Sequence, residues 1–164
     1  MFSCNWTSKR IKFRTKNELS NNLTIIKTDS VNDIALLRSE SILCEIPIKF
    51  DREPELQIEN IIFYLGFDQN RSDAQNKKTI QVNLAKVSAQ GEQINKGGKA
   101  KFIEFEGVGI PGYSGGPVFD GKENLIAIMR EARSKKEVKG HNELLINRAF
   151  LLNKININKL KYGK

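Results

Sequence analysis

Residues 109–119 read Gly-Ile-Pro-Gly-Tyr-Ser-Gly-Gly-Pro-Val-Phe, which places a serine in a glycine-dense turn before an apolar strand. Glycine permits backbone conformations that other residues rarely adopt and lets a substrate approach the main chain closely. If Ser114 is a nucleophile, the backbone amides of Gly112 and Ser114 can both donate to an oxyanion that develops beside it. A hairpin turn with an incidental serine is the alternative reading of Ser-Gly-Gly alone. The longer pattern, Gly-x-Ser-Gly-Gly-Pro before a hydrophobic strand, favours a nucleophile.

A second motif lies upstream, where residues 32–37 read Asn-Asp-Ile-Ala-Leu-Leu. Together the two segments resemble trypsin-like (chymotrypsin-fold) serine peptidases, whose nucleophile loop is Gly-x-Ser-Gly-Gly-Pro and whose Asp-Ile-Ala-Leu-Leu block carries the triad aspartate. Their order and spacing are similar to those of the shorter bacterial, Deg-like members, and the resemblance covers most of the chain. It implies that Ser114 is the catalytic nucleophile, and that Asp33 orients the catalytic base.

The catalytic base is the part of this site that the sequence does not supply. A serine hydroxyl needs a base to accept its proton, and in the family this base is a histidine that precedes the aspartate. The chain has one histidine, His141, and it follows Ser114. The string around Trp6 resembles the histidine block with tryptophan in the place of histidine, and an indole cannot accept a proton at neutral pH. We expect His141 to lie on a surface turn, with a substrate-side contact as the alternative.

Two explanations of the missing base stay open. Either the base has been lost and Trp6 marks its vacated position, or this is an N-terminally truncated piece whose histidine block lies upstream of Met1. In both cases the strands that precede the histidine in the family are missing, and we expect little or no peptidase activity from these residues. A half-barrel leaves open sheet edges, through which a second copy could pair.

The resemblance also implies a substrate pocket. Val108 matches the floor of the pocket for the side chain before the scissile bond, and an apolar floor would not select lysine or arginine. Arg130, Glu131 and Ala132 match the segment that pairs with the substrate backbone as an added strand. Tyr113 replaces the aspartate of zymogen-activated members, so activation by a freed N-terminus is not expected. The expected partner is therefore a polypeptide substrate or ligand.

Short apolar runs separated by polar turns predict an all-β protein, and the resemblance narrows this to a double β-barrel with an incomplete first barrel. We expect residues 1–50 to carry the aspartate motif and residues 51–164 to carry the serine motif. Three segments are predicted to connect strands: a polar loop at 68–78, a glycine-rich link at 91–99 and a charged hairpin at 130–142. A short helix is predicted at about 153–161.

Composition excludes several classes of protein. With 39% apolar and 28% charged residues the sequence is typical of a soluble globular domain, and no apolar run approaches the length needed to span a membrane. Two cysteines and no visible signal peptide predict a reduced, cytoplasmic chain. No cofactor motif is visible, and the cysteines and the histidine lack the spacing of a metal site.

The net charge of +8 leaves nucleic-acid binding as a distant alternative function. The basic residues are scattered, and no aromatic residues interleave with them as a base-stacking surface requires. The nearer alternative to a peptidase is a non-catalytic, peptidase-like module that binds peptides.

Overall fold

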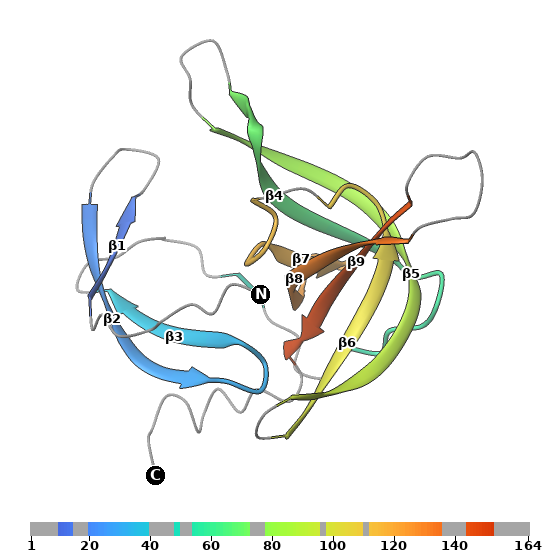
Figure 1. Cartoon of the computed structure of the whole chain (residues 1–164), viewed down its shortest axis with the longest axis horizontal. Coiled ribbons are helices and arrows are strands. Elements are labelled where there is room, and N and C mark those ends of the chain that lie inside the picture. The colour runs from blue at the N-terminus through green and yellow to red at the C-terminus, as the bar shows by residue number, and fades with distance from the viewer. Residues whose placement is uncertain are drawn as a thin grey trace. The chain divides into compact units, whose positions relative to one another are not determined.

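The computed structural model consists of β-strands throughout its described part, so the predicted all-β class is confirmed (Figure 1). The described residues are 10–14, 20–39, 48–49, 54–72, 78–95, 98–109, 112–135 and 144–152. The chain divides into two compact units, one that includes Met1–Pro47 and one that consists of Ile48–Lys154. The boundaries predicted for the two parts of the chain stay a prediction.

The first unit contains a three-stranded antiparallel sheet in the order β1-β2-β3. Its strands are β1 (Arg10–Arg14), β2 (Ser20–Asp29) and β3 (Ile34–Ser39). β2 pairs with both neighbours and contains a register shift between Ile25 and Lys27. Among the described residues the outer edges of β1 and β3 have no partner strand.

The second unit is a closed barrel in the order β4-β5-β6-β9-β8-β7, with β7 pairing back onto β4. Its strands are β4 (Ile61–Ser72), β5 (Lys78–Asn95), β6 (Gly98–Glu106), β7 (Pro117–Asp120), β8 (Leu125–Lys135) and β9 (Leu144–Leu151). Closure gives each strand a partner on both sides over at least part of its length. The barrel therefore forms a rigid support for the turn that contains Ser114.

Alternating side chains fill this barrel. Ile62 and Tyr64 on β4, and Ile103 and Phe105 on β6, are each at most 1% exposed, and the residues between them face outward. Because successive side chains of a strand point to opposite faces, this period-two pattern gives each strand one buried face. The described part of the chain contains no helix long and apolar enough to cross a membrane.

Three predicted connections are shorter than expected. β4 extends through Ser72 and β5 begins at Lys78, so much of the polar segment 68–78 belongs to strands. β5 continues to Asn95, which pairs with Gly98, and the link at 91–99 is therefore a short hairpin turn. β8 continues to Lys135 in place of a hairpin that begins at residue 130. In each case pairing with a neighbouring strand overrides the local polar composition. The helix predicted at 153–161 lies outside the described residues.

Candidate active site

The residues just before β7, 112–116, form a tight turn that we call the serine loop. The backbone φ angle is +108° at Gly112 and +85° at Gly115. Residues other than glycine rarely adopt such positive φ angles, so the conformation of the loop requires glycine at both positions. Ser114 lies between them and is exposed to solvent.

Backbone hydrogen bonds hold the serine loop between β4 and β8. On the β4 side, the amide of Phe67 donates to the carbonyl of Gly112 over 3.2 Å. On the β8 side, the amide of Gly115 donates to the carbonyl of Met129, and the Met129 amide donates to the carbonyl of Gly116, each over 2.8 Å. One side of the serine loop is therefore bonded to β4 and the other side to β8.

Tyr113 anchors the loop to the barrel core, a role that the sequence analysis missed. Its side chain is only 3% exposed, and its hydroxyl accepts a 3.1 Å hydrogen bond from the Asn83 side-chain amide. The ring packs over Gly66, where a Cβ atom would overlap it. The sequence signal was a large aromatic residue within a glycine-rich turn, because such a side chain usually contributes to a hydrophobic core.

The Ser114 hydroxyl donates a 2.9 Å hydrogen bond to the main-chain carbonyl of Arg130 on β8. A peptide carbonyl accepts hydrogen bonds but is far too weak a base to remove a serine proton, so this contact does not activate the oxygen. Arg130 is the extra residue at a register shift between Met129 and Glu131 in the pairing of β8 with β9. Such bulges redirect the backbone locally.

The two amides predicted to form the oxyanion hole are those of Gly112 and Ser114. Among the described residues, no hydrogen bond uses the backbone amide of Gly112 or of Ser114. Backbone amides in a glycine turn beside a serine hydroxyl are the donors that acyl transfer requires for its oxyanion.

β8 presents a free edge next to Ser114. In the described residues β7 pairs with β8 only from Leu125 to Ile128, and the serine loop bonds to Met129. β8 continues for six residues past that point, to Lys135, with β9 alone as its partner strand. An extended peptide added to this edge would end at the serine hydroxyl.

Comparison with known families agrees with this geometry. The family model described as the trypsin-like peptidase domain matches residues 3–128. The chain belongs to the trypsin-like peptidase family. No match was found among curated protein sequences.

Solved structures of proteases share the fold. The HtrA-type protease AlgW with a decapeptide superposes with a TM-score of 0.66 at 18% identity, covering 96% of this chain and 46% of AlgW. The Rv3671c protease in its inactive form gives a TM-score of 0.70 at 14% identity, covering 97% of this chain and 75% of that one. The chymotrypsin-like architecture implied by the sequence is thus confirmed. The chain spans less than half the length of AlgW.

In this trypsin-like peptidase domain the side chains of Arg130 and Glu131 are engaged away from the serine loop. The Arg130 guanidinium lies over the Phe150 ring, 4.8 Å from its centroid. The Glu131 carboxylate accepts from Arg133 over 2.7 Å and lies 3.5 Å from a guanidinium nitrogen of Arg148. Only the main chain of these two residues is therefore presented along the free edge of β8.

Val108, the predicted floor of the substrate pocket, is accessible to solvent. Its side chain is 45% exposed, and its backbone amide hydrogen-bonds to the Tyr64 hydroxyl. Burial raises the pKa of that hydroxyl, and the hydrogen bond from Val108 opposes the rise. The segment before the serine loop is thus attached to the core through its main chain.

Asn147, on β9, lies where the sequence analysis placed no functional residue. It is fully buried, and neither polar atom of its side chain has a hydrogen-bond partner in the described part of the molecule. Gly109 packs directly on its side-chain oxygen, and a Cβ atom at Gly109 would also overlap the side chain of Ala132. Gly109 and Ala132 therefore lie close together beside the Asn147 amide. The sequence signal for this residue was a polar side chain at a position of the strand that alternation assigns to the buried face.

Asp33 is described within the first unit, at the end of the β2–β3 turn. The Asp29 carboxylate orders this turn by accepting hydrogen bonds from the backbone amides of Val31 (2.9 Å) and Asn32 (3.1 Å). Asp33 itself has a φ of +55° and is exposed, whereas a triad carboxylate is expected to be buried. Trp6 and His141 lie outside the described residues.

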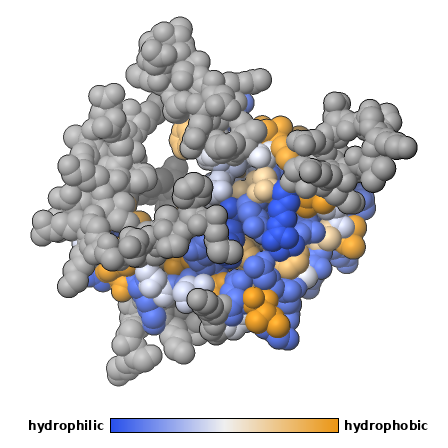
Figure 2. All heavy atoms as spheres, in the orientation of Figure 1, coloured by the Kyte–Doolittle hydropathy of each residue, from blue (hydrophilic) through white to orange (hydrophobic). Residues whose placement is uncertain are grey.

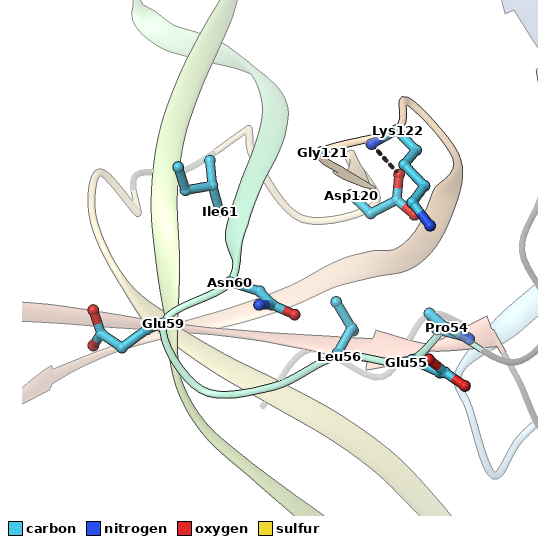
Figure 3. A pocket seen from close by; sticks show the side chains of 9 residues that line it. All are labelled: Pro54, Glu55, Leu56, Glu59, Asn60, Ile61, Asp120, Gly121 and Lys122. Atoms are coloured by element: carbon cyan, nitrogen blue, oxygen red, sulfur yellow. Dashed lines mark hydrogen bonds between the residues drawn. The ribbon is translucent and has the colours of Figure 1, made fainter.

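A cavity in the second unit does not have the character of a metal site. It has a volume of about 660 Å³ and is bordered by three carboxylates, those of Glu55, Glu59 and Asp120 (Figure 3). Glu59 lies apart from the other two (Figure 3) and pairs with Lys86 over 2.9 Å. Asp120 accepts from the backbone amides of Lys122 and Asn124. Within the described residues no group of three or more histidine, cysteine or acidic side chains could hold an ion.

Proposed function

We infer that the chain is a trypsin-like peptidase domain that binds an extended polypeptide along β8 and presents it to Ser114. The observation that carries this inference is the position of Ser114. It is exposed, it lies between two glycines with positive φ angles, and it stands where the free edge of β8 begins. AlgW, which shares the fold, is described with a decapeptide. Affinity along β8 would come from main-chain hydrogen bonds, as in other cases of strand addition.

In the reaction of such a site, Ser114 attacks the peptide carbonyl, the Gly112 and Ser114 amides hold the oxyanion, and Asp33 orients the base. The residues that the structure describes include no histidine, and the chain's one histidine, His141, follows Ser114 in sequence. We therefore expect these residues alone to hydrolyse peptide bonds very slowly. Loss of one triad member leaves only the residual catalysis of binding and the oxyanion hole.

The alternative is a domain that binds peptides without cleaving them. The hydrogen bond from Ser114 to the Arg130 carbonyl favours it, because the hydroxyl rests on an acceptor that cannot remove its proton. Trp6 in the place of the family's histidine favours it as well.

Covalent labelling tests whether the Ser114 hydroxyl is activated. The folded chain would be incubated with a fluorophosphonate and its intact mass measured, with Ser114→Ala as the control. We expect wild-type labelling to be as slow as that of the control. Rapid labelling that is lost in Ser114→Ala would show that a base lies beside the hydroxyl, and the non-catalytic alternative would then be wrong.

A further inference from the structure

A second cavity opens directly beside the nucleophile. It has a volume of about 360 Å³, and Ser114 is one of its lining residues. The other side chains that line it are those of Leu65, Phe67, Ile80 and Pro117, and glycine main chain completes the wall. Among the described residues that line it, none has a charged side chain.

The cavity lies on the flank of the serine loop that faces β4. Leu65 and Phe67 belong to β4, and Ile80 on β5 is the cross-strand partner of Phe67. The opposite flank carries the contacts with β8, including the hydrogen bond from Ser114 to Arg130. A peptide that adds to β8 and passes Ser114 therefore continues toward this cavity.

The direction of such a peptide follows from β8. An added strand antiparallel to β8 approaches Ser114 from the Lys135 end, with its residues before the serine paired to β8. Its residues after that point leave β8 and reach the β4 flank. The cavity is thus placed to receive a side chain on the C-terminal side of the residue held at Ser114.

Two of the glycines that line the cavity pack closely on their neighbours. The Tyr113 ring covers Gly66, and Gly116 packs on the main-chain carbonyl of Leu65, so neither position has room for a side chain. At the rim, Phe67 is 47% and Ile80 58% exposed. Both would lose contact with water if an apolar group entered, which is a favourable exchange.

Exposure of apolar side chains does not by itself mark the site. Hydrophobic residues also lie in separate groups elsewhere on the surface shown in Figure 2. Val82 and Leu84, which follow Ile80 on the same face of β5, are 66% and 65% exposed but do not line the cavity. What distinguishes Ile80 is its place in a cavity that contains Ser114.

We propose that this cavity is a subsite for one large apolar side chain of the bound polypeptide, located just C-terminal to the residue at Ser114. The proposal rests on the function inferred above and adds a sequence preference to it: leucine, isoleucine or phenylalanine at that position, and exclusion of acidic residues.

The test is a leucine scan read by fluorescence polarisation. Labelled decapeptides of alanine and serine, each with a single leucine at a different position, are titrated against the folded chain. Leucine at one position of the peptide should raise the affinity about tenfold, which is the effect expected for burying most of one side chain. Aspartate at that position should abolish the gain.

Two variants assign the preference to the cavity. Ile80→Ser removes an apolar wall and Ile80→Trp fills the space, and both should reduce the leucine gain to about twofold or less. Because Ile80 is largely exposed, neither change should prevent folding, which thermal unfolding would check. Val82→Ser is the matched control on the same face of the same strand, and it should keep the full gain.

The outcomes separate the two proposals. A leucine preference that survives both Ile80 variants, or no preference in peptides that do bind, would overturn the subsite and leave the inferred function standing. Failure of every decapeptide to bind would overturn both.

Discussion

The hydroxyl of Ser114 donates a 2.9 Å hydrogen bond to the Arg130 carbonyl, a main-chain group on the free edge of β8. A peptide that pairs with this edge competes for that carbonyl. Ser114→Ala should therefore bind decapeptides as tightly as the wild type or up to about threefold more tightly, because no hydroxyl has to be displaced. Fluorescence polarisation would measure this, and a tenfold loss would instead show that the hydroxyl contacts the ligand.

The close packing of Gly116 on the Leu65 carbonyl predicts a large effect of a small substitution. A Cβ atom there would overlap main-chain oxygen, which cannot move without shifting β4. We expect Gly116→Ala to lower the free energy of unfolding by about 2 kcal/mol or more, measured by urea denaturation. Gly121→Ala is the control, since a methyl group at Gly121 would have no atom within 4 Å, and it should be neutral or stabilising by up to about 1 kcal/mol.

The buried amide of Asn147 predicts an ordered series of stabilities. Replacing an unpartnered buried amide by an apolar group of similar shape costs little, so Asn147→Leu should be neutral or stabilising by about 1 kcal/mol. Asn147→Asp buries a carboxylate without a partner and should destabilise by about 2 kcal/mol or more at neutral pH. Thermal unfolding would measure both. A large loss in Asn147→Leu would mean that the amide is hydrogen-bonded to water.

Arg148 joins three strands on the outside of the barrel. It donates to the Glu104 carboxylate and, over 2.9 Å, to the Gln93 side chain, and it stacks 4.0 Å from the centroid of Phe102. Its side chain is 13% exposed. We expect Arg148→Met to cost about 2–3 kcal/mol of stability, since Glu104 would lose its partner while partly buried.

The matched control for Arg148 is a solvent-exposed ion pair of the same barrel. Lys86 and Glu59 lie 2.9 Å apart, but their side chains are 62% and 70% exposed. Lys86→Met should change the free energy of unfolding by less than about 0.5 kcal/mol. Equal effects of the two substitutions would show that burial does not strengthen the Arg148 contacts.

Asp120 gives the stability of the barrel a pH dependence. Burial by itself would raise the pKa of this carboxyl, but hydrogen bonds from the Asn124 side chain and from the backbone amides of Asn124 and Lys122, with the charge of Lys122, lower it below 3.8. A lowered folded-state pKa stabilises the protein above the unfolded-state value, and the contribution is lost as the pH falls through the folded-state value. Asp120→Asn should therefore be less stable than the wild type at pH 7, with a difference that shrinks below about pH 4. Urea denaturation at both pH values would measure it, and a constant difference would contradict this account.

The fold class and the serine loop could be predicted because their signals are local. Alternation of apolar residues produces strands with one buried face, as in Ile62 and Tyr64. The positive φ angles of Gly112 and Gly115 follow from residue types within a single turn. The location in the cytoplasm, the absence of cofactors and the pairing of copies stay predictions.

What the sequence by itself determined is thus the alternation of the strands and the shape of the turn around Ser114. Tertiary structure alone decided that the Ser114 hydroxyl rests on Arg130, that Asn147 is buried beneath Gly109, and that Phe67 and Ile80 border a cavity beside the nucleophile. The physical reason is that these contacts depend on the register of strands far apart in the chain. That register is set by hydrogen bonds and burial across the whole barrel, which no local pattern encodes.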